Sequence, residues 1–166
     1  TDENKRKAIG DFYRQAFEQY RSMPVSVHAL EKNETEGERK DQLKRVTSSA
    51  EYLGENMGRA PALLIACIDG RVDEVNGPGT NMVHASHYGS ILPALWSFML
   101  AARMHGIGTS WTTLHLMFEQ QVAELLGIPF DSVTQAALTP IAYTKGTQFK
   151  PALRRDLDQV LHVDAW

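Results

Sequence analysis

The chain has 166 residues, of which 43% are apolar and 22% charged, with a formal net charge of −3 at pH 7. These values are typical of one globular domain spanning 1–166 and exclude a collagen-like or disordered chain. An acidic balance argues against a nucleic-acid partner, and a single cysteine excludes an internal disulfide and a multi-cysteine metal site. No apolar run approaches the roughly 20 residues of a membrane span. Without a signal peptide either, we expect a cytoplasmic protein with no membrane partner.

The first third of the chain predicts two amphipathic helices separated by a charged segment. Residues 3–21 carry apolar side chains at helical spacing, which places them on one face. They are Ala8, Ile9, Phe12, Tyr13, Ala16, Phe17 and Tyr20. Residues 41–58 repeat the pattern and end at Gly58, a residue that favours helix termination. The segment 22–40 contains Pro24 and many charges, so it is either a solvated loop or a mobile lid over a site.

The middle of the chain predicts a buried strand, a loop and an apolar helix. Residues 61–68 are apolar on both faces, the pattern of a buried central strand in which Cys67 is an inert core thiol. Residues 69–90 are rich in turn-forming residues and predict a long loop. Residues 91–106 predict a helix with Pro93 in its first turn. This helix is apolar nearly all round, so it is either a central core helix or an obligate dimer interface.

The last part of the chain predicts two further β segments around a short helix. A β-rich run covers 109–115, a helix covers 116–127, and a strand covers 133–144. Helical and β segments alternate without hairpin signals. This alternation favours a sheet layered with helices, in an α/β or α+β fold.

The common catalytic motifs do not occur in this sequence. His84 and His87 lack the thiolate or carboxylate companions of a metal site, so we expect no metal. Two features stand out. The run 109-TSWTT-113 places hydroxyls and an indole at a strand end, either through plain β propensity or as a ledge for a planar polar ligand. The pair Arg154-Arg155 is either surface charge or a clamp for phosphate or carboxylate.

Three segments, taken in order, resemble the FMN-dependent nitroreductase family. They are 89-GSILPALWSFMLAARMHGIGTSWTTLH-115, 122-VAELLGIPFDSVTQAALTPIAYTKG-146 and 149-FKPALRRDLDQVLHVDAW-166. The second segment has the order typical of the family: a helix, then Gly-Ile-Pro, then a strand ending in Pro-Ile-x-Tyr. The third segment has the arginine pair that is frequent near the C-terminus in the family, followed by a terminal His-x-x-x-Trp motif. The order and spacing of the three segments, more than any one motif, make the resemblance specific.

The resemblance implies an α+β homodimer with a mixed central sheet of four or five strands flanked by helices. It places the apolar helix 91–105 across the dimer interface, together with two FMN molecules. The residues implied to contact FMN are Ser90, Ile91, Pro93, Trp111, Thr112, Thr113, Leu114, Arg154 and Arg155. The two arginines are implied to reach the phosphate. Thr113 is the catalytic candidate, because its backbone N–H or a threonine hydroxyl is implied to lie near the reactive flavin N5.

The activity implied is hydride transfer from NAD(P)H through flavin N5 to a nitroaromatic, quinone or related small-molecule acceptor, in ping-pong order. The alternatives are a non-enzymatic flavin-binding protein and a flavin-free dimeric domain of the same fold. The family's usual opening, an Arg-Ser-x-Arg segment and an Asn/Gln-Pro-Trp stretch, is not found, and helix 3–21 matches what normally follows it. Either an N-terminal segment carrying an edge of the core is missing, or the chain is a variant that binds flavin weakly or not at all.

Overall fold

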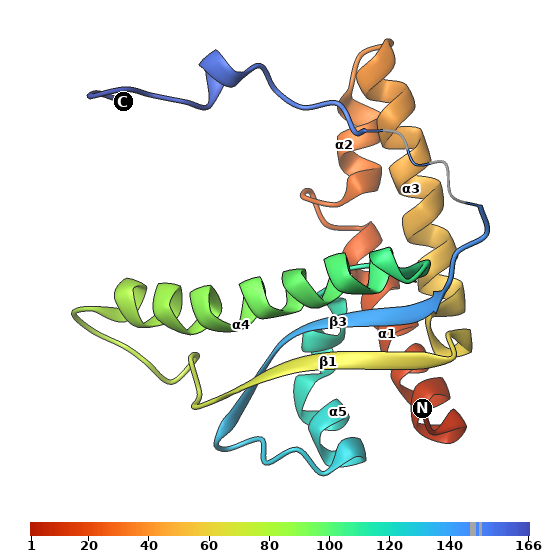
Figure 1. The fold of residues 1–166 in the computed structure, drawn as a ribbon, viewed down its shortest axis with the longest axis vertical. Helices are drawn as coiled ribbons and strands as arrows, with labels where there is room; N and C mark the ends of the chain where they lie inside the picture. Colours follow the sequence, from red (N-terminus) through yellow and green to blue (C-terminus); the bar gives the residue numbers. More distant parts are fainter. Residues whose placement is uncertain (147–148, 150) are drawn as a thin grey trace.

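A computed structural model describes residues 1–146, 149 and 151–166, and it confirms an α+β fold in which helices cover both faces of a small sheet (Figure 1). The helices are α1 (Glu3–Arg21), α2 (Val27–Asn33), α3 (Glu38–Asn56), α4 (Thr80–Met104) and α5 (Glu119–Leu126). The strands are β1 (Ala62–Asp69), β2 (Ile107–Thr109) and β3 (Val133–Tyr143). Three short 3-10 helices complete the fold: η1 (Met57–Arg59), η2 (Leu114–Phe118) and η3 (Leu157–Gln159).

The described residues form a sheet of three strands in the order β1-β3-β2, with both pairings antiparallel. This differs from the mixed sheet of four or five strands that the resemblance implies. β3 is the middle strand of the three, and β1 lies at their edge. The prediction that 61–68 is a central strand is therefore wrong for these residues. Apolar residues on both faces of a strand indicate that helices pack against both faces of the sheet. They do not indicate whether a strand pairs along one edge or along both.

Two apolar clusters lie on opposite faces of the sheet, because neighbouring side chains of a strand point to opposite sides. On one face Leu138 of β3 packs with residues of α1, η1 and α5; these are Ile9, Tyr13, Met57 and Val122. On the other face Ala137 packs with Ala66 of β1 and Leu95 of α4. The sheet is thus sandwiched between α4 and the pair α1 and α5, as Figure 1 shows.

The N-terminal helices follow the sequence pattern closely. α1 matches the predicted range 3–21, and Asp2 caps it by accepting a 2.9 Å hydrogen bond from the Lys5 amide. α3 begins at Glu38, three positions before the predicted start, and its C-terminal end runs into η1. Within 22–40 the structure contains α2, which packs on α3. The role of this segment as a lid stays a prediction.

α4 is longer at its N-terminal end than the sequence indicated. It begins at Thr80, directly after Gly79 with its φ of 88°, so the second half of the predicted loop 69–90 is helical and that boundary is wrong. Pro93 consequently lies inside the helix instead of in its first turn. Its ring nitrogen has no hydrogen, so the carbonyl of Gly89 loses its usual helical partner there. Residues 80–90 combine polar side chains with glycine and show no helical periodicity, which is why the early start was missed.

The C-terminal half confirms the predicted order of strand, helix and strand, with shorter limits. β2 ends at Thr109, and of the remaining predicted run 109–115 only Thr112 bridges to β3, at Leu138. α5 follows η2 and ends at Gly127, which has a φ of 74°. No helix among the described residues is both long and apolar enough to cross a membrane.

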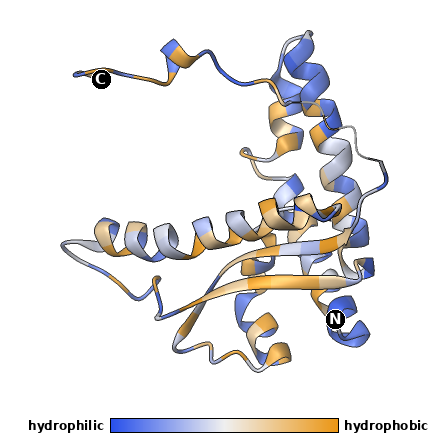
Figure 2. Cartoon of the chain, in the orientation of Figure 1, coloured by the Kyte–Doolittle hydropathy of each residue, from blue (hydrophilic) through white to orange (hydrophobic). Residues whose placement is uncertain are grey.

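The last described residues leave the body of the fold. Residues 153–166, which we call the C-terminal arm, are exposed along their whole length and project away from the sheet (Figure 1). Figure 2 shows that the arm contains hydrophobic residues, as does the surface of α4. Neither surface is covered by another part of the described chain.

Candidate functional site

The segment after β2, which holds the predicted ligand ledge, is fixed from two sides. The Ser110 amide donates to Thr139 Oγ1 of β3 at 2.9 Å. Thr112 exchanges two backbone hydrogen bonds with Leu138, of 3.0 and 2.9 Å. The Thr112 hydroxyl also lies 2.9 Å from the hydroxyl of Tyr13 on α1. The backbone of 110–113 is therefore rigidly placed between the sheet and α1 before any ligand binds.

This segment and the first half of α4 enclose an open apolar hollow of about 440 Å³, which we call the Trp111 hollow. It is lined by Tyr88, Gly89, Leu92, Pro93, Trp96 and Trp111. The structure thus brings together two residues that the resemblance implied, Pro93 and Trp111, from segments far apart in sequence. Planar ligands are commonly bound against aromatic and apolar walls of this kind.

The other implied residues near this hollow differ in their surroundings. Ser90 is exposed on α4, whereas Ile91 packs against the buried cluster of Ala66, Leu95 and Ala137. Thr113 is exposed at the start of η2, and its backbone amide donates to no other residue in the described part of the chain. Leu114 packs against the core on the α1 side of the sheet. Of these four, Ser90 and Thr113 are exposed and carry polar groups.

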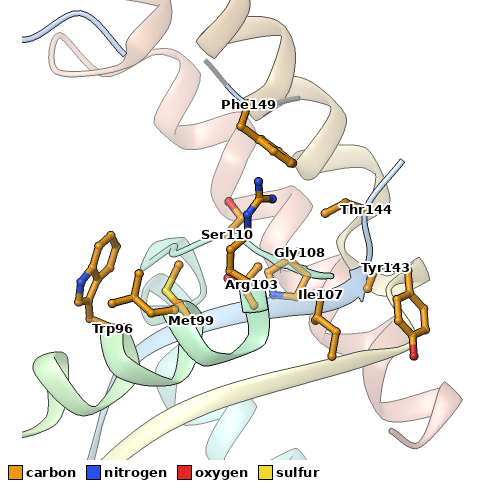
Figure 3. Close-up of a pocket in the computed structure, with 13 residues that line it drawn as sticks. Trp96, Met99, Arg103, Ile107, Gly108, Ser110, Tyr143, Thr144 and Phe149 are labelled. Atoms are coloured by element: carbon orange, nitrogen blue, oxygen red, sulfur yellow. The ribbon is translucent and has the colours of Figure 1, made fainter. Parts of the chain in front are cut away.

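A second hollow of about 550 Å³, which we call the α4–β2 hollow, shares Trp96 with the first. Its walls come from the second half of α4, from β2 and from the end of β3. Figure 3 shows Arg103 in this hollow with Phe149 pointing toward it, and the guanidinium carbon lies 3.5 Å from the centre of the Phe149 ring. Arg103 forms no ion pair with any acidic residue of the described chain.

The predicted phosphate clamp lies elsewhere in the single chain. Arg154 and Arg155 are exposed at the base of the C-terminal arm, and Arg154 donates only to the neighbouring Leu153 carbonyl, at 3.4 Å. The arm is tied to α3 by the Leu153 amide, which donates to Gln42 Oε1 at 2.6 Å. The structure therefore does not bring the arginine pair to Trp111, and its phosphate role stays a prediction.

Sequence reasoning missed a cluster of ion pairs around the buried Arg71 side chain, near the start of β3. Arg71, whose side chain is only 4% exposed, forms ion pairs with Glu119 at 2.9 Å and with Asp73 at 2.8 Å. It also donates to the Val133 carbonyl and stacks on Phe130. Both carboxylates raise the pKa of Arg71. The cluster ties the loop after β1 to α5 and β3, and no local spacing in the sequence signals it.

His84 and His87 have hydrogen-bond partners, and Cys67 and His115 are shielded from solvent. His84 lies 2.6 Å from the Val72 carbonyl and His87 lies 3.0 Å from the Val83 carbonyl. Among the residues that the structure describes, no three His, Cys, Asp or Glu side chains are grouped as metal ligands. Burial raises the pKa of Cys67, with Glu119 adding to the effect, so its thiol stays protonated near neutral pH. His115, by contrast, is fully buried, and neither ring nitrogen has a hydrogen-bond partner in the described chain.

The residues present fit the ring half of the flavin that the resemblance implies. The Trp111 hollow offers apolar walls for a planar ring system, and the exposed Thr113 amide is free to donate to a ring nitrogen. The phosphate half needs cations. The implied cations are Arg154 and Arg155, which in a single chain lie on the projecting arm.

Comparisons with known proteins identify the family and agree with the fold. The family model described as "Nitroreductase family" matches residues 2–143. Among solved structures, a BluB-like flavoprotein from Clostridium difficile 630 matches with a TM-score of 0.60 and 12% sequence identity, covering 98% of this chain and 75% of that chain. At this identity the likeness shows the fold alone. No curated protein matches the sequence.

Proposed function

Because this chain belongs to the nitroreductase family, which indicates a flavin-dependent oxidoreductase, we propose that it binds FMN and uses NAD(P)H to reduce a small acceptor. The observation that carries the proposal is the Trp111 hollow beside the rigid segment 110–113. Bound FMN would supply the hydride chemistry that links NAD(P)H oxidation to reduction of a nitroaromatic, quinone or related acceptor, the donor and the acceptor using the site in turn.

The chain's own residues bind and orient in this proposal. Trp111, Pro93 and Tyr88 form apolar walls for the ring and exclude water from it. The Thr113 amide donates a hydrogen bond to the N5 edge, and Tyr13 acts as a positioning residue because its hydroxyl holds Thr112 in place. Fixed donors of this kind need no rearrangement when the charge of a ligand changes. Arg154 and Arg155 pair with the phosphate as charge-assisted donors.

We also propose a homodimer with α4 in its interface. Several large apolar side chains of α4 are exposed in the single chain: Met82, Trp96, Phe98, Leu100 and Met104. Trp96 is 53% exposed and Met104 86%. So many large exposed apolar side chains on one helix are unusual for a monomer and favour an interaction site there. A second copy of the chain would cover these side chains, because a two-fold axis brings the same surface of each copy together.

One observation favours the alternative of a flavin-free dimeric domain. The arginine pair and the Trp111 hollow are not assembled in one chain, so a single copy offers no phosphate site next to the ring site. The oxidoreductase proposal therefore requires the arm to take a defined position in the assembled protein. The other alternative, a flavin-binding protein without turnover, shares the hollow and differs only in its lack of reaction with NAD(P)H.

The test is the visible absorption spectrum of the purified protein with and without added FMN, recorded before and after anaerobic NADH and NADPH. We expect a bound-flavin spectrum that bleaches with at least one of the two nucleotides. Bound flavin that neither nucleotide bleaches would support the flavin-binding alternative. A protein that retains no added FMN would support the flavin-free domain.

Arg154→Ala separates the phosphate role from folding. The Arg154 side chain contacts only a neighbouring carbonyl within the described chain, so we expect unchanged urea unfolding together with at least tenfold weaker FMN binding. The matched control is Arg45→Ala, which removes an exposed arginine from α3 and should leave FMN affinity unchanged. Equal FMN affinity for Arg154→Ala and the wild type would remove Arg154 from the site.

A further inference from the structure

The first half of α4 lacks the apolar packing that holds the second half. Residues 80–90 contain no buried side chain, and the two buried residues of the helix, Leu95 and Ala102, lie further along it. The apolar cluster on this face of the sheet reaches α4 only from Ile91 onward. Figure 1 shows the N-terminal end of the helix extending beyond the strands. Something other than the core must therefore hold residues 80–90 in place.

The two halves of α4 are also joined by a weak point in the helix. Pro93 has no amide hydrogen, so the carbonyl of Gly89 lacks its usual helical partner. Glycine adds backbone freedom at the same place, where a side chain would meet nothing within 4 Å. Helices bend most readily at proline and glycine. The packing of Leu95 therefore fixes the second half of α4 without fixing the direction of the first.

The side chain of His84 attaches the first half to the rest of the fold. Its Nε2 lies 2.6 Å from the carbonyl oxygen of Val72, in the loop after β1. Because a carbonyl only accepts hydrogen bonds, Nε2 carries the hydrogen and donates it. The other hydrogen-bonding side chains of residues 80–90 contact only the turn before the helix or the helix itself. His84 is thus the residue that ties this stretch to another element.

The loop that accepts this hydrogen bond is itself firmly held. The Val72 side chain is buried, and its amide donates to Thr134 Oγ1 of β3 at 3.2 Å. The hydroxyl of Thr134 donates in turn to the Gly70 carbonyl at 2.6 Å. Between them, Arg71 forms its 2.9 Å ion pair with α5. His84 therefore binds a loop whose position is already set by β3 and α5.

The Trp111 hollow begins one helical turn after this attachment. Tyr88 and Pro93 line the hollow together with Trp111. Residues four positions apart lie on the same side of a helix, so a displacement of His84 moves Tyr88 with it. The α4 wall of the hollow thus lies between two fixed points, the hydrogen bond of His84 and the buried Leu95. Binding walls depend on supporting contacts of this kind outside the site.

We infer that His84 is a positioning residue of the flavin site, an inference that rests on the proposed function. Its Nε2–H holds the first half of α4 against the loop after β1 and so sets the place where Tyr88 meets the ring of the ligand. His84 itself contacts neither the ring nor the phosphate. It acts through the helix, and the group that matters is the hydrogen-bond donor.

Two substitutions separate the donor from the size of the side chain. Glutamine keeps an N–H at the end of the side chain, whereas leucine fills a similar volume without a donor. In a fluorescence titration His84→Leu should weaken FMN binding roughly fivefold, the effect expected from one lost hydrogen bond. His84→Gln should bind within about twofold of the wild type, because the donor is restored. The control is His105→Leu, which removes an exposed histidine from the other end of α4 and should bind like the wild type.

Two further measurements distinguish positioning from a general loss of structure. Lumiflavin has the flavin ring without the ribityl phosphate, so His84→Leu should weaken lumiflavin and FMN binding by the same factor. Arg154→Ala should weaken FMN binding alone. In the flavin-free protein, hydrogen exchange of the amides of 84–92 should be faster in His84→Leu than in the wild type, with the amides of α5 unchanged.

The contrary results distinguish this inference from the proposed function. A wild type that binds neither FMN nor lumiflavin refutes the proposed function and the role of His84 with it. A wild type that binds flavin, together with a His84→Leu variant that binds it equally tightly, overturns the role of His84 alone. Equal weakening by leucine and glutamine also overturns that role, because it shows that the donor does not matter. A loss of FMN binding without a loss of lumiflavin binding overturns it as well, since the effect then lies at the phosphate.

Discussion

His115 makes the stability of the fold depend on pH. The side chain is fully buried in η2, and both ring nitrogens lack hydrogen-bond partners among the described residues. Burial lowers the pKa of His115 from its ordinary 6.5 to about 4. The folded protein therefore holds this ring neutral at pH values where the unfolded chain already binds a proton.

The sign and size of the effect follow from that difference. Between pH 6.5 and about 4 the unfolded state binds more protons, so the free energy of unfolding falls as the pH falls through this window. Above pH 6.5 the contribution is complete. A shift of this size corresponds to about 3 kcal/mol, since one pKa unit corresponds to about 1.4 kcal/mol.

The assay is urea unfolding of the wild type and of His115→Leu at a series of pH values from 7 to 4, without flavin. Leucine fills a similar volume and does not titrate. Removing a buried ring whose N–H lacks an acceptor should leave the variant at least as stable at pH 7. As the pH falls to 4, the wild type should lose about 3 kcal/mol more than the variant.

The control is His105→Gln, which changes an exposed ring at the end of α4. Its unfolding free energy should fall with pH as that of the wild type does, because this variant retains His115. Parallel curves for the wild type and His115→Leu would refute the reasoning. They would mean that the buried ring is protonated as readily as a free histidine.

Two further variants test the packing of the fold by urea unfolding at pH 7. Arg71→Met should cost about 3 kcal/mol, because it leaves Glu119 as an unpaired and largely buried carboxylate. Arg14→Ala, which breaks the exposed pair with Asp11, should cost less than about 0.5 kcal/mol; equal losses would show that the Arg71 cluster is no more than a surface pair. Gly10→Ala should cost roughly 1 to 3 kcal/mol, because its Cβ would lie 2.7 Å from the Gly58 backbone where α1 meets η1. Gly89→Ala on α4 meets nothing within 4 Å, and a gain from helix propensity is expected there; a loss as large as that of Gly10→Ala would contradict the packing argument.

Periodicity in the sequence was sufficient to find most of the elements. α1, α3 and α5 carry apolar residues at helical spacing, and strand β3 is a long apolar run bounded by turn residues. Local chemistry also marked some ends, such as Asp2 before α1 and Gly127 after α5. These signals depend only on residues within a few positions of one another, so a single sequence contains them.

The parts that sequence reasoning missed depend on contacts between distant segments. The hydrogen bond between Tyr13 and Thr112 joins residues 99 positions apart. The sequence predicted Tyr13 only as part of a helix face and Thr112 only as part of the segment 109–113. Arg71 meets Glu119 across 48 positions. The start of α4 lacked periodicity, and the edge position of β1 depends on which strand pairs beside it. In each case the deciding partner is distant in sequence.

The apolar helix α4 illustrates the difference between what the sequence determines and what the tertiary structure determines. The sequence alone determined that residues 91–105, the second part of α4, have almost no polar face and must be covered by their own chain or by another. Only the tertiary structure showed which side of the helix its own chain covers: Leu95 and Ala102 are buried, whereas Trp96 and Leu100 are exposed. The reason is that the hydrophobic effect is non-directional: it favours burial of apolar side chains but does not specify which residues pack against them.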